Sequence, residues 1–270
     1  MHAGTSCVHV EGSGTALLRR CTISWAADEG IEVCQRGSQV VAESCVLTEN
    51  TCGVCVGGSG ASFKGSACKA SGHKFAGYTV QKDASMELTD CSSTQDERGC
   101  TCELGGRLTA VRTDVEASKE AGIVVFSGGH ATLTGCQVLR GRDRGVWVRE
   151  SRSKASMTGC TVEDTQLNCV TVDKGAAAVL KTCVLSKSKT GSGLFIMNAG
   201  SHVAAEDCAF EHNARSGAYA AFKGLLAARV CRSSGNKRSG FLERDRGCIE
   251  LSHGCVCNGR VVEQPALGVA

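Results

Sequence analysis

Residues 122–138 read Gly-Ile-Val-Val-Phe-Ser-Gly-Gly-His-Ala-Thr-Leu-Thr-Gly-Cys-Gln-Val and contain the repeating unit of the chain. A glycine opens an alternating apolar pair, a glycine-rich bend follows, and a second alternating pair precedes Cys-x-apolar. Period-two alternation over a few residues, bounded by glycine and polar turns, is typical of short half-buried strands. The unit therefore predicts short strands joined by tight turns.

The cysteine that closes this unit returns about every 23 or 24 residues. The cysteine column comprises Cys21, Cys45, Cys68, Cys91, Cys136, Cys160, Cys183, Cys208, Cys231 and Cys255. Three short strands in a unit of this length are too few for a propeller blade and favour a coil that stacks on the next coil. We expect an all-β fold, a parallel β-helix (solenoid) of about eleven coils with three short strands per coil.

Leucine-rich repeats are the nearest competing solenoid, because their unit of about 20 to 29 residues includes this length. Their leucine-asparagine signature is absent, and β-branched residues and cysteine fill the apolar positions. The turns of a β-sandwich need not keep one phase through the chain, which makes that fold a weaker alternative.

With 34 glycines and one proline, the chain contains little that would interrupt the hydrogen-bonded ladders. We expect residues 1–270 to form a single domain, with repeats over roughly 5–258 and a C-terminal tail over 259–270.

The nineteen cysteines are compatible with disulfides, metal binding or packing. Column cysteines on neighbouring coils would lie about 4.8 Å apart at Cα, which a disulfide can span. Reduced cysteine is also a small buried hydrophobe, and disulfide frameworks are typical of smaller secreted chains, so reduced packing is favoured. Cys52 and Cys55 form one surface CxxC pair, but a structural zinc site needs four convergent ligands. We predict no metal site and no cofactor.

The repeated Gly-Val-x-Val, Gly-Gly-x-Ala-x-Leu and Cys-x-Val segments resemble the right-handed parallel β-helix of the pectin-lyase-like superfamily. More narrowly, they are similar to the cysteine-bearing β-helix repeats of F-box-type ubiquitin-ligase receptors. The resemblance implies a single-stranded right-handed coil, and the superfamily includes polysaccharide lyases, hydrolases and epimerases. Asn50, Asn213 and Asn236 lie five places after their column cysteine, where such repeats often carry a turn asparagine. We expect these side chains to bond to turn backbone.

An enzyme of this superfamily would need converging acidic or basic side chains. The outward strand positions offer no compact acidic cluster, since Glu32 and Glu103 lie several coils from Asp173. Asp173 and Arg149 occupy matching outward places on adjacent coils, where a surface ion pair is expected. No Ser-His-Asp, phosphate-loop or dinucleotide signature occurs. We therefore predict no catalytic residues, and a non-catalytic protein is favoured over an enzyme.

The outward face of the first strand in each coil carries much of the limited aromatic content of the chain. Its central positions are Glu32, Cys55, Thr79, Thr101, Val124, Trp147, Thr171, Phe195, Tyr219 and Leu242. We predict an exposed apolar stripe with a binding site formed by Phe126, Trp147, Arg149, Asp173, Phe195, Met197 and Tyr219. Such a stripe is typical of a protein-binding surface, of a face covered by another segment, or of a sugar-stacking platform.

The net charge is +3, and basic runs such as residues 140–144, Arg-Gly-Arg-Asp-Arg, are interpreted as solvated turns. We expect no nucleic-acid partner and no membrane partner. A start at Met1 without a signal peptide favours a cytoplasmic or other intracellular location.

The function favoured by the sequence is that of a non-catalytic scaffold that recognises a protein partner. The alternative is a carbohydrate-active or carbohydrate-binding β-helix.

Overall fold

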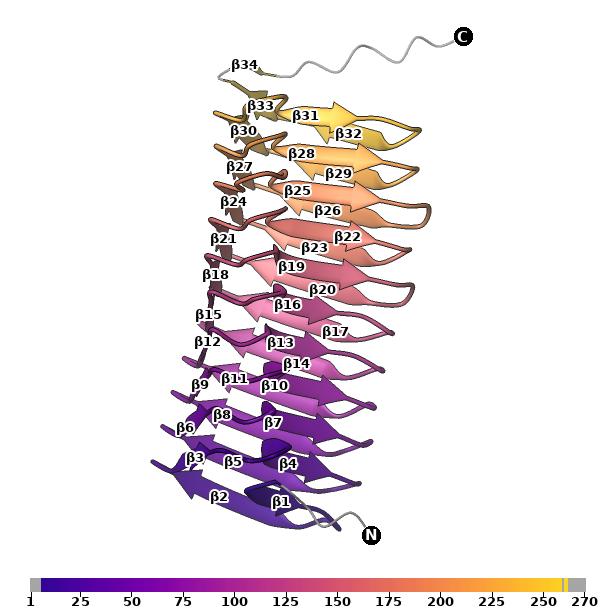
Figure 1. Cartoon of the computed structure of the whole chain (residues 1–270). Helices are drawn as coiled ribbons and strands as arrows, with labels where there is room; N and C mark the ends of the chain where they lie inside the picture. Colours follow the sequence, from indigo (N-terminus) through magenta and orange to yellow (C-terminus); the bar gives the residue numbers. More distant parts are fainter. Residues whose placement is uncertain (1–5, 259, 262–270) are drawn as a thin grey trace.

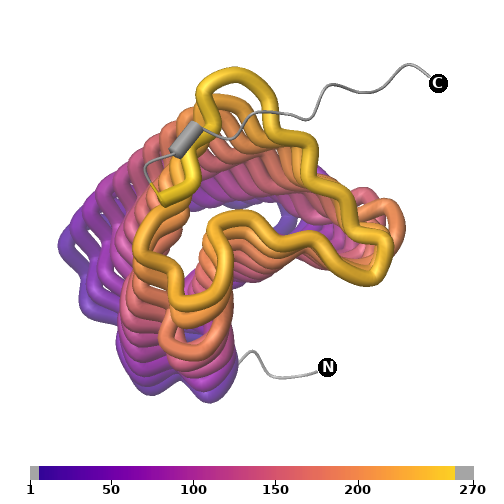
Figure 2. Tube along the Cα trace, turned by 90° about the horizontal axis from the view of Figure 1, so that it is seen from above, coloured from indigo at the N-terminus to yellow at the C-terminus, as the bar shows by residue number. Residues whose placement is uncertain are grey.

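The computed structural model describes residues 6–258 and 260–261, which form a rod of stacked coils with three short parallel strands per coil (Figure 1). Seen from above, each coil lies over the preceding one with a gradual rotation (Figure 2). The predicted all-β solenoid of about eleven coils is confirmed, because two of the sheets have 11 strands and the third has 12. In the described part of the chain, no helix is long and apolar enough to cross a membrane.

Each coil contributes its strands in turn to three parallel sheets, here called A, B and C. Sheet A consists of β1 (Val8–Val10), β4 (Glu29–Cys34), β7 (Cys52–Gly57), β10 (Ala76–Gln81), β13 (Arg98–Cys102), β16 (Ala121–Val125), β19 (Arg144–Arg149), β22 (Val170–Asp173), β25 (Leu194–Met197), β28 (Ala218–Ala221) and β31 (Phe241–Glu243). Sheet B consists of β2 (Thr15–Arg19), β5 (Gln39–Glu43), β8 (Ser62–Ser66), β11 (Ser85–Thr89), β14 (Arg107–Val111), β17 (His130–Thr134), β20 (Lys154–Thr158), β23 (Ala177–Lys181), β26 (His202–Glu206), β29 (Leu225–Arg229) and β32 (Cys248–Ser252). Sheet C consists of β3 (Thr22–Ser24), β6 (Val46–Thr48), β9 (Lys69–Ser71), β12 (Ser92–Thr94), β15 (Asp114–Glu116), β18 (Gln137–Leu139), β21 (Thr161–Glu163), β24 (Val184–Ser186), β27 (Ala209–Glu211), β30 (Arg232–Ser234), β33 (Val256–Cys257) and the antiparallel β34 (Arg260–Val261).

The interior of the rod is filled by the side chains that the period-two pattern points inward. Ile31 and Val33 of sheet A, for example, are completely buried, as are Val146 and Val148 five coils later. Larger side chains from the other sheets, such as Met157, close the space between them. The apolar core runs along the described coils as one cluster, which leaves the outer faces of the sheets to carry function.

The cysteine column packs as predicted, because every member after Cys21 is buried. Each buried thiol donates to the carbonyl two or three residues earlier, as Cys183 does to Lys181 at 3.2 Å. All nineteen cysteines are free thiols in the structure. Outside the column, burial raises the pKa of Cys102 in β13 and of Cys169, just before β22, to about 12, which keeps these two thiols protonated and unreactive at neutral pH.

A ladder of mostly polar side chains occupies the turn between sheet C and sheet A, five residues after the column positions, with Ala26 and Gly141 as apolar exceptions. Asn50 Oδ1 accepts the backbone N–H of Ala26 at 2.8 Å, and His73 Nδ1 accepts the N–H of Asn50 at 3.1 Å. Asp96 Oδ1 in turn accepts the N–H of His73 at 2.7 Å. The predicted turn role of the three asparagines is confirmed, since the pattern recurs at Asn213 and Asn236. At these five positions the turn side chain thus satisfies a backbone donor of the coil before it.

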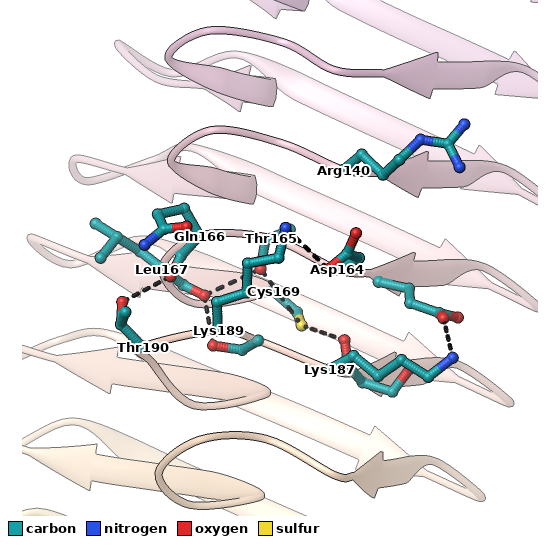
Figure 3. A network of polar contacts seen from close by, with 12 residues as sticks. Arg140, Asp164, Thr165, Gln166, Leu167, Cys169, Lys187, Lys189 and Thr190 are labelled. Atoms are coloured by element: carbon teal, nitrogen blue, oxygen red, sulfur yellow. Dashed lines mark hydrogen bonds and ion pairs between the residues drawn. The ribbon is translucent and has the colours of Figure 1, made fainter.

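The glycine that opens most sheet A strands leaves room for this ladder. A Cβ on Gly193 would lie 2.7 Å from the carbonyl oxygen of Gly217 and 2.8 Å from Nδ2 of Asn213. Cys169 takes the glycine's place one coil earlier, where the next ladder residue is the small Ser188. Its thiol donates to Ser186 at 3.3 Å and lies 3.7 Å from the Thr165 hydroxyl (Figure 3). At Cys169 a side chain fits where the ladder residue of the next coil is small.

Two ladder residues, His73 and Asp96, are ionisable and buried, and burial shifts their pKa values in opposite directions. Burial lowers the pKa of His73 to about 4, so the neutral ring can accept the Asn50 N–H. Burial also raises the pKa of Asp96 to about 6, although Ser93 and the His73 backbone N–H donate to its carboxylate. Below the ordinary aspartate pKa both folded and unfolded states hold a proton, and above about 6 neither does. The buried carboxylate thus lowers stability as the pH rises from about 4 to about 6.

We expect Asp96→Asn to stabilise the protein at pH 7.5 or so by roughly 2 kcal/mol and to have little effect near pH 4, because the amide keeps the acceptor without the buried charge. Urea unfolding of both proteins between these limits measures the difference. The His73 contribution is common to both proteins and cancels. Asn213→Asp is the mirror variant and should destabilise at neutral pH. A gain for Asp96→Asn that is equal at both ends of the range would contradict this account.

Candidate functional site

The outer face of sheet A carries its central side chains in one continuous row. Glu32 pairs with Cys55, Val124 pairs with Trp147, and the pairing continues without a bulge to Tyr219 and Leu242. The predicted strand phase is therefore correct in every coil. Arg149 and Asp173 also lie opposite one another, as expected.

The exposure of this row differs from the prediction. Trp147, Phe195 and Tyr219 are only partly exposed to solvent, and Val124 is only 3% exposed. Strands about 4.8 Å apart bring neighbouring side chains of one row into contact, so each covers part of the next. The most exposed large apolar side chain in the described coils is Trp25, at 77%, in a turn elsewhere. The expectation of an open apolar stripe is thus wrong in its degree of exposure.

Two of the aromatic residues predicted to face solvent, Phe195 and Tyr219, stack on each other. The ring centroids of Phe195 and Tyr219 lie 4.9 Å apart with an interplanar angle of 29°. Such a pair stabilises adjacent coils, but each ring covers a face that a sugar would need. Phe126 and Met197, one coil before Arg149 and one coil after Asp173, are half-buried at the same edge of the sheet.

Trp147 stands at the centre of the most polar part of this face. The guanidinium carbon of Arg144 lies 4.4 Å from the centroid of the indole, and that of Arg149 lies 4.5 Å from it. Asp173 ends the adjacent strand, β22, opposite Arg149. Arg144, Trp147, Arg149 and Asp173 are called the Trp147 cluster below. The sequence predicts a solvated turn at Arg144, but the structure makes Arg144 the first residue of β19.

Each member of the Trp147 cluster has a buried polar atom without a hydrogen-bond partner: Arg144 Nε, Trp147 Nε1, Arg149 Nε and Asp173 Oδ1. Buried polar groups in folded proteins are almost always paired, so four such atoms in one place are unusual. Arg144 Nη1 donates to Asp143 at 2.6 Å, and Arg149 Nε lies 3.4 Å from Glu150 without hydrogen-bond geometry. The expected ion pair between Arg149 and Asp173 does not form, since neither residue has such a contact among the described ion pairs.

Asp173 is the carboxylate of the cluster and is only 8% exposed. Burial raises its pKa, while the nearby Trp147 N–H and then the charges of Arg149, Lys174 and Arg144 lower it in part. The Trp147 N–H lies close enough to act on the carboxylate but does not complete a hydrogen bond. A buried carboxylate with a free oxygen beside two guanidinium groups can accept a proton or bind a hydroxyl.

Other residues considered from the sequence do not join this cluster. Glu103 lies two coils before Arg149, and burial raises its pKa. Cys52 is buried, and burial beside Glu29 raises the pKa of Cys55 to about 12. A thiol of this kind is a poor nucleophile at neutral pH, so the CxxC pair lacks the chemistry of a redox site.

The fold defines the class of protein as a parallel β-helix whose outer face on sheet A is polar at its centre. A family model described as a right-handed β-helix region matches residues 1–93, 38–187 and 144–262. The protein therefore belongs to the right-handed β-helix family, and the predicted right-handed parallel β-helix is confirmed. The narrower resemblance to F-box-type receptors stays a prediction. No curated protein sequence matches the chain.

Several solved structures share the fold at low sequence identity. The A-module of the mannuronan C-5 epimerase AlgE4 from Azotobacter vinelandii is 14% identical, with a TM-score of 0.59 over 94% of this chain and 90% of that one. Pectate lyase Pel9A is 13% identical, with a TM-score of 0.56 over 90% of this chain and 69% of that one. Tailspike protein 3 of bacteriophage CBA120 is 10% identical, with a TM-score of 0.51 over 92% and 56%. At these identities the likeness concerns the fold alone.

We expect Asp173→Asn to stabilise the protein, by roughly 1 kcal/mol at pH 8, because it removes a buried charge that is incompletely paired. The pKa of Asp173 is raised in the folded state, so the cost of its charge appears as the pH rises through that value. The gain should therefore shrink toward pH 4 in urea unfolding experiments. Asp164→Asn is the matched control, because Asp164 pairs with Lys189 at 3.1 Å near the surface. Destabilisation by Asp173→Asn at pH 8 would contradict the assignment.

Proposed function

We propose that the protein is a carbohydrate-active β-helix that binds a uronate-containing polysaccharide on the outer face of sheet A, at the Trp147 cluster. The observation that carries the proposal is the grouping, in two neighbouring strands, of four buried polar atoms that complete no hydrogen bond, two of which, the Trp147 N–H and an Asp173 oxygen, belong to side chains that lie near one another. Three of the four are N–H donors and one is a carboxylate oxygen. A sugar acid offers carboxylate and hydroxyl groups that match both kinds.

The two arginines favour an anionic sugar over a neutral one. Guanidinium groups form short, directional bonds with carboxylates, and in both Arg144 and Arg149 the Nε–H completes no hydrogen bond. The indole between them holds both guanidinium groups in place through cation–π contacts. The donors are therefore oriented before a ligand arrives, which lowers the entropic cost of binding.

Asp173 supplies the candidate base. A base near a uronate can remove the proton on C5, next to the carboxylate, and the electron pair of the C–H bond then moves into the carboxylate. A guanidinium group would stabilise the charge that develops there. Loss of the substituent on C4 completes an elimination, whereas return of a proton to the opposite face of C5 completes an epimerisation. Burial of Asp173 raises its pKa and so makes it a better proton acceptor than an exposed aspartate.

This function agrees with the alternative predicted from the sequence better than with the favoured protein-recognition scaffold. A protein-docking surface would use large exposed apolar anchors, whereas Trp147 is held by two arginines and Phe195 stacks on Tyr219. The solved structures that share the fold include a pectate lyase and a mannuronan epimerase. Their names support polygalacturonate and mannuronate polymers as the first substrates to test.

The test is to measure binding and turnover with polygalacturonate, polymannuronate and neutral dextran. We expect the two anionic polymers to bind by calorimetry and dextran not to bind. Elimination would appear as ultraviolet absorbance of the unsaturated product, and proton removal alone as exchange of the C5 hydrogen in D2O by NMR. Turnover is expected with at least one of the two polymers.

Variants separate the roles of the cluster. Arg149→Ala should weaken binding about tenfold to a hundredfold, since it removes a bond to a charged group. Asp173→Asn should keep binding but abolish elimination and C5 exchange. Arg229→Ala, on the outer face of sheet B and paired with Glu206, is the control and should change neither. Equal binding of dextran, or turnover that survives Asp173→Asn, would overturn the proposal.

A further inference from the structure

A second group of functional side chains lies on the outer face of sheet A, in the first two coils. His9 on β1 pairs in register with Glu32 on β4, and Val10 pairs with Val33. Glu11 therefore lies next to Cys34, because both follow one position later. Alternate residues of a strand point to the same face, so His9, Glu11, Glu32 and Cys34 form a two-by-two square on that face. They are called the His9 square below.

The distances from His9 to the other side chains of the His9 square match those of metal ligands. One donor atom each from His9, Glu32 and Cys34 lies within 4.8 Å of the other two. His9 Nε2 is 3.7 Å from Cys34 Sγ and 3.4 Å from Glu11 Oε2. Zinc bonds of about 2.0 Å to nitrogen and oxygen and about 2.3 Å to sulfur place tetrahedral ligands roughly 3.3 to 3.6 Å apart.

We propose that the His9 square binds one divalent transition-metal ion, zinc by preference. His9 Nε2, Cys34 Sγ and Glu11 are the ligands. Glu32 is the outer carboxylate, because its Oε2 lies 2.7 Å from Nδ1 on the other side of the ring. A carboxylate in this place fixes the tautomer and orientation of a metal-binding histidine. A nitrogen, a thiolate and a carboxylate form a ligand set suited to zinc rather than to calcium or magnesium.

The surroundings leave the fourth coordination position open. Gly57 lies next to Cys34 on the following strand and has no side chain to cover it. Glu32, Cys34 and Gly57 line a surface cavity of about 330 Å³ that reaches Lys82. A water molecule or a ligand could therefore complete the tetrahedron from this side.

An ordinary surface ion pair between His9 and Glu32 does not account for the whole square. Such a pair needs no thiol at the same imidazole, and Glu11 Oε2, which lies 3.4 Å from His9 Nε2, also accepts a hydrogen bond from Gln35 Nε2 at 2.7 Å. A metal ion would neutralise the carboxylates and displace the thiol proton to solvent. The site is separate from the Trp147 cluster, on β1 and β4 rather than β19 and β22, and does not depend on the proposed function.

Cobalt titration of the chelator-treated full chain tests the proposal. We expect saturable binding of one Co²⁺ with a thiolate-to-cobalt charge-transfer band and the intense visible bands of tetrahedral cobalt. Cys34→Ser should remove the charge-transfer band, and His9→Ala should abolish binding. Glu32→Gln should weaken binding about 10- to 100-fold without changing the spectrum, as an outer carboxylate does. Zinc should displace the cobalt.

Cys55→Ser is the matched control, because Cys55 points to the same face one coil later but lies outside the square. It should bind cobalt as the wild type does. Circular dichroism of each variant establishes that it is folded. The proposal is overturned if the wild type shows no saturable cobalt binding, or if folded Cys34→Ser keeps the charge-transfer band.

Discussion

The hydrogen bonds between successive coils are the constraint on which the rest of the structure depends. In all three sheets the strands of successive coils pair in parallel with no slip, and among the described strands only β34 pairs antiparallel. A fixed register places equivalent residues of every coil in rows about 4.8 Å apart. The cysteine column, the polar ladder and the face of sheet A are three such rows, so one backbone rule organises both packing and chemistry.

These rows explain which features of the fold can be predicted from the sequence. A period of two and a repeat of 23 or 24 residues place Ile31 inside and Trp147 outside correctly. The ladder was recognised only at its asparagines, because His73 and Asp96 fill the same position with different chemistry. Their shared role, accepting a backbone N–H from the preceding coil, becomes visible only when the coils are aligned in space.

The functional surfaces were harder to predict for two physical reasons. The phase of a strand gives the direction of a side chain but not how far its neighbours cover it, which is why the row through Phe195 is less exposed than expected. Turn composition also misled, since Arg144 follows a basic turn and yet opens β19 against Trp147. For the His9 square, the signal was present as His-x-Glu and Glu-x-Cys spaced by one repeat. Only the register of β1 against β4 shows that these two pairs of residues lie side by side on one face.

Both candidate sites are built from only two adjacent coils. The Trp147 cluster uses β19 and β22, and the His9 square uses β1, β4 and the residue that follows β1. In a rod where each coil contacts mainly its neighbours, such a site depends on two adjacent coils and little on the rest of the chain. Two coils could be exchanged for another pair of equal length, and the new surface chemistry would be carried with them. Diversification in this architecture can therefore proceed by swapping modules, while the packing of the distant coils is left intact.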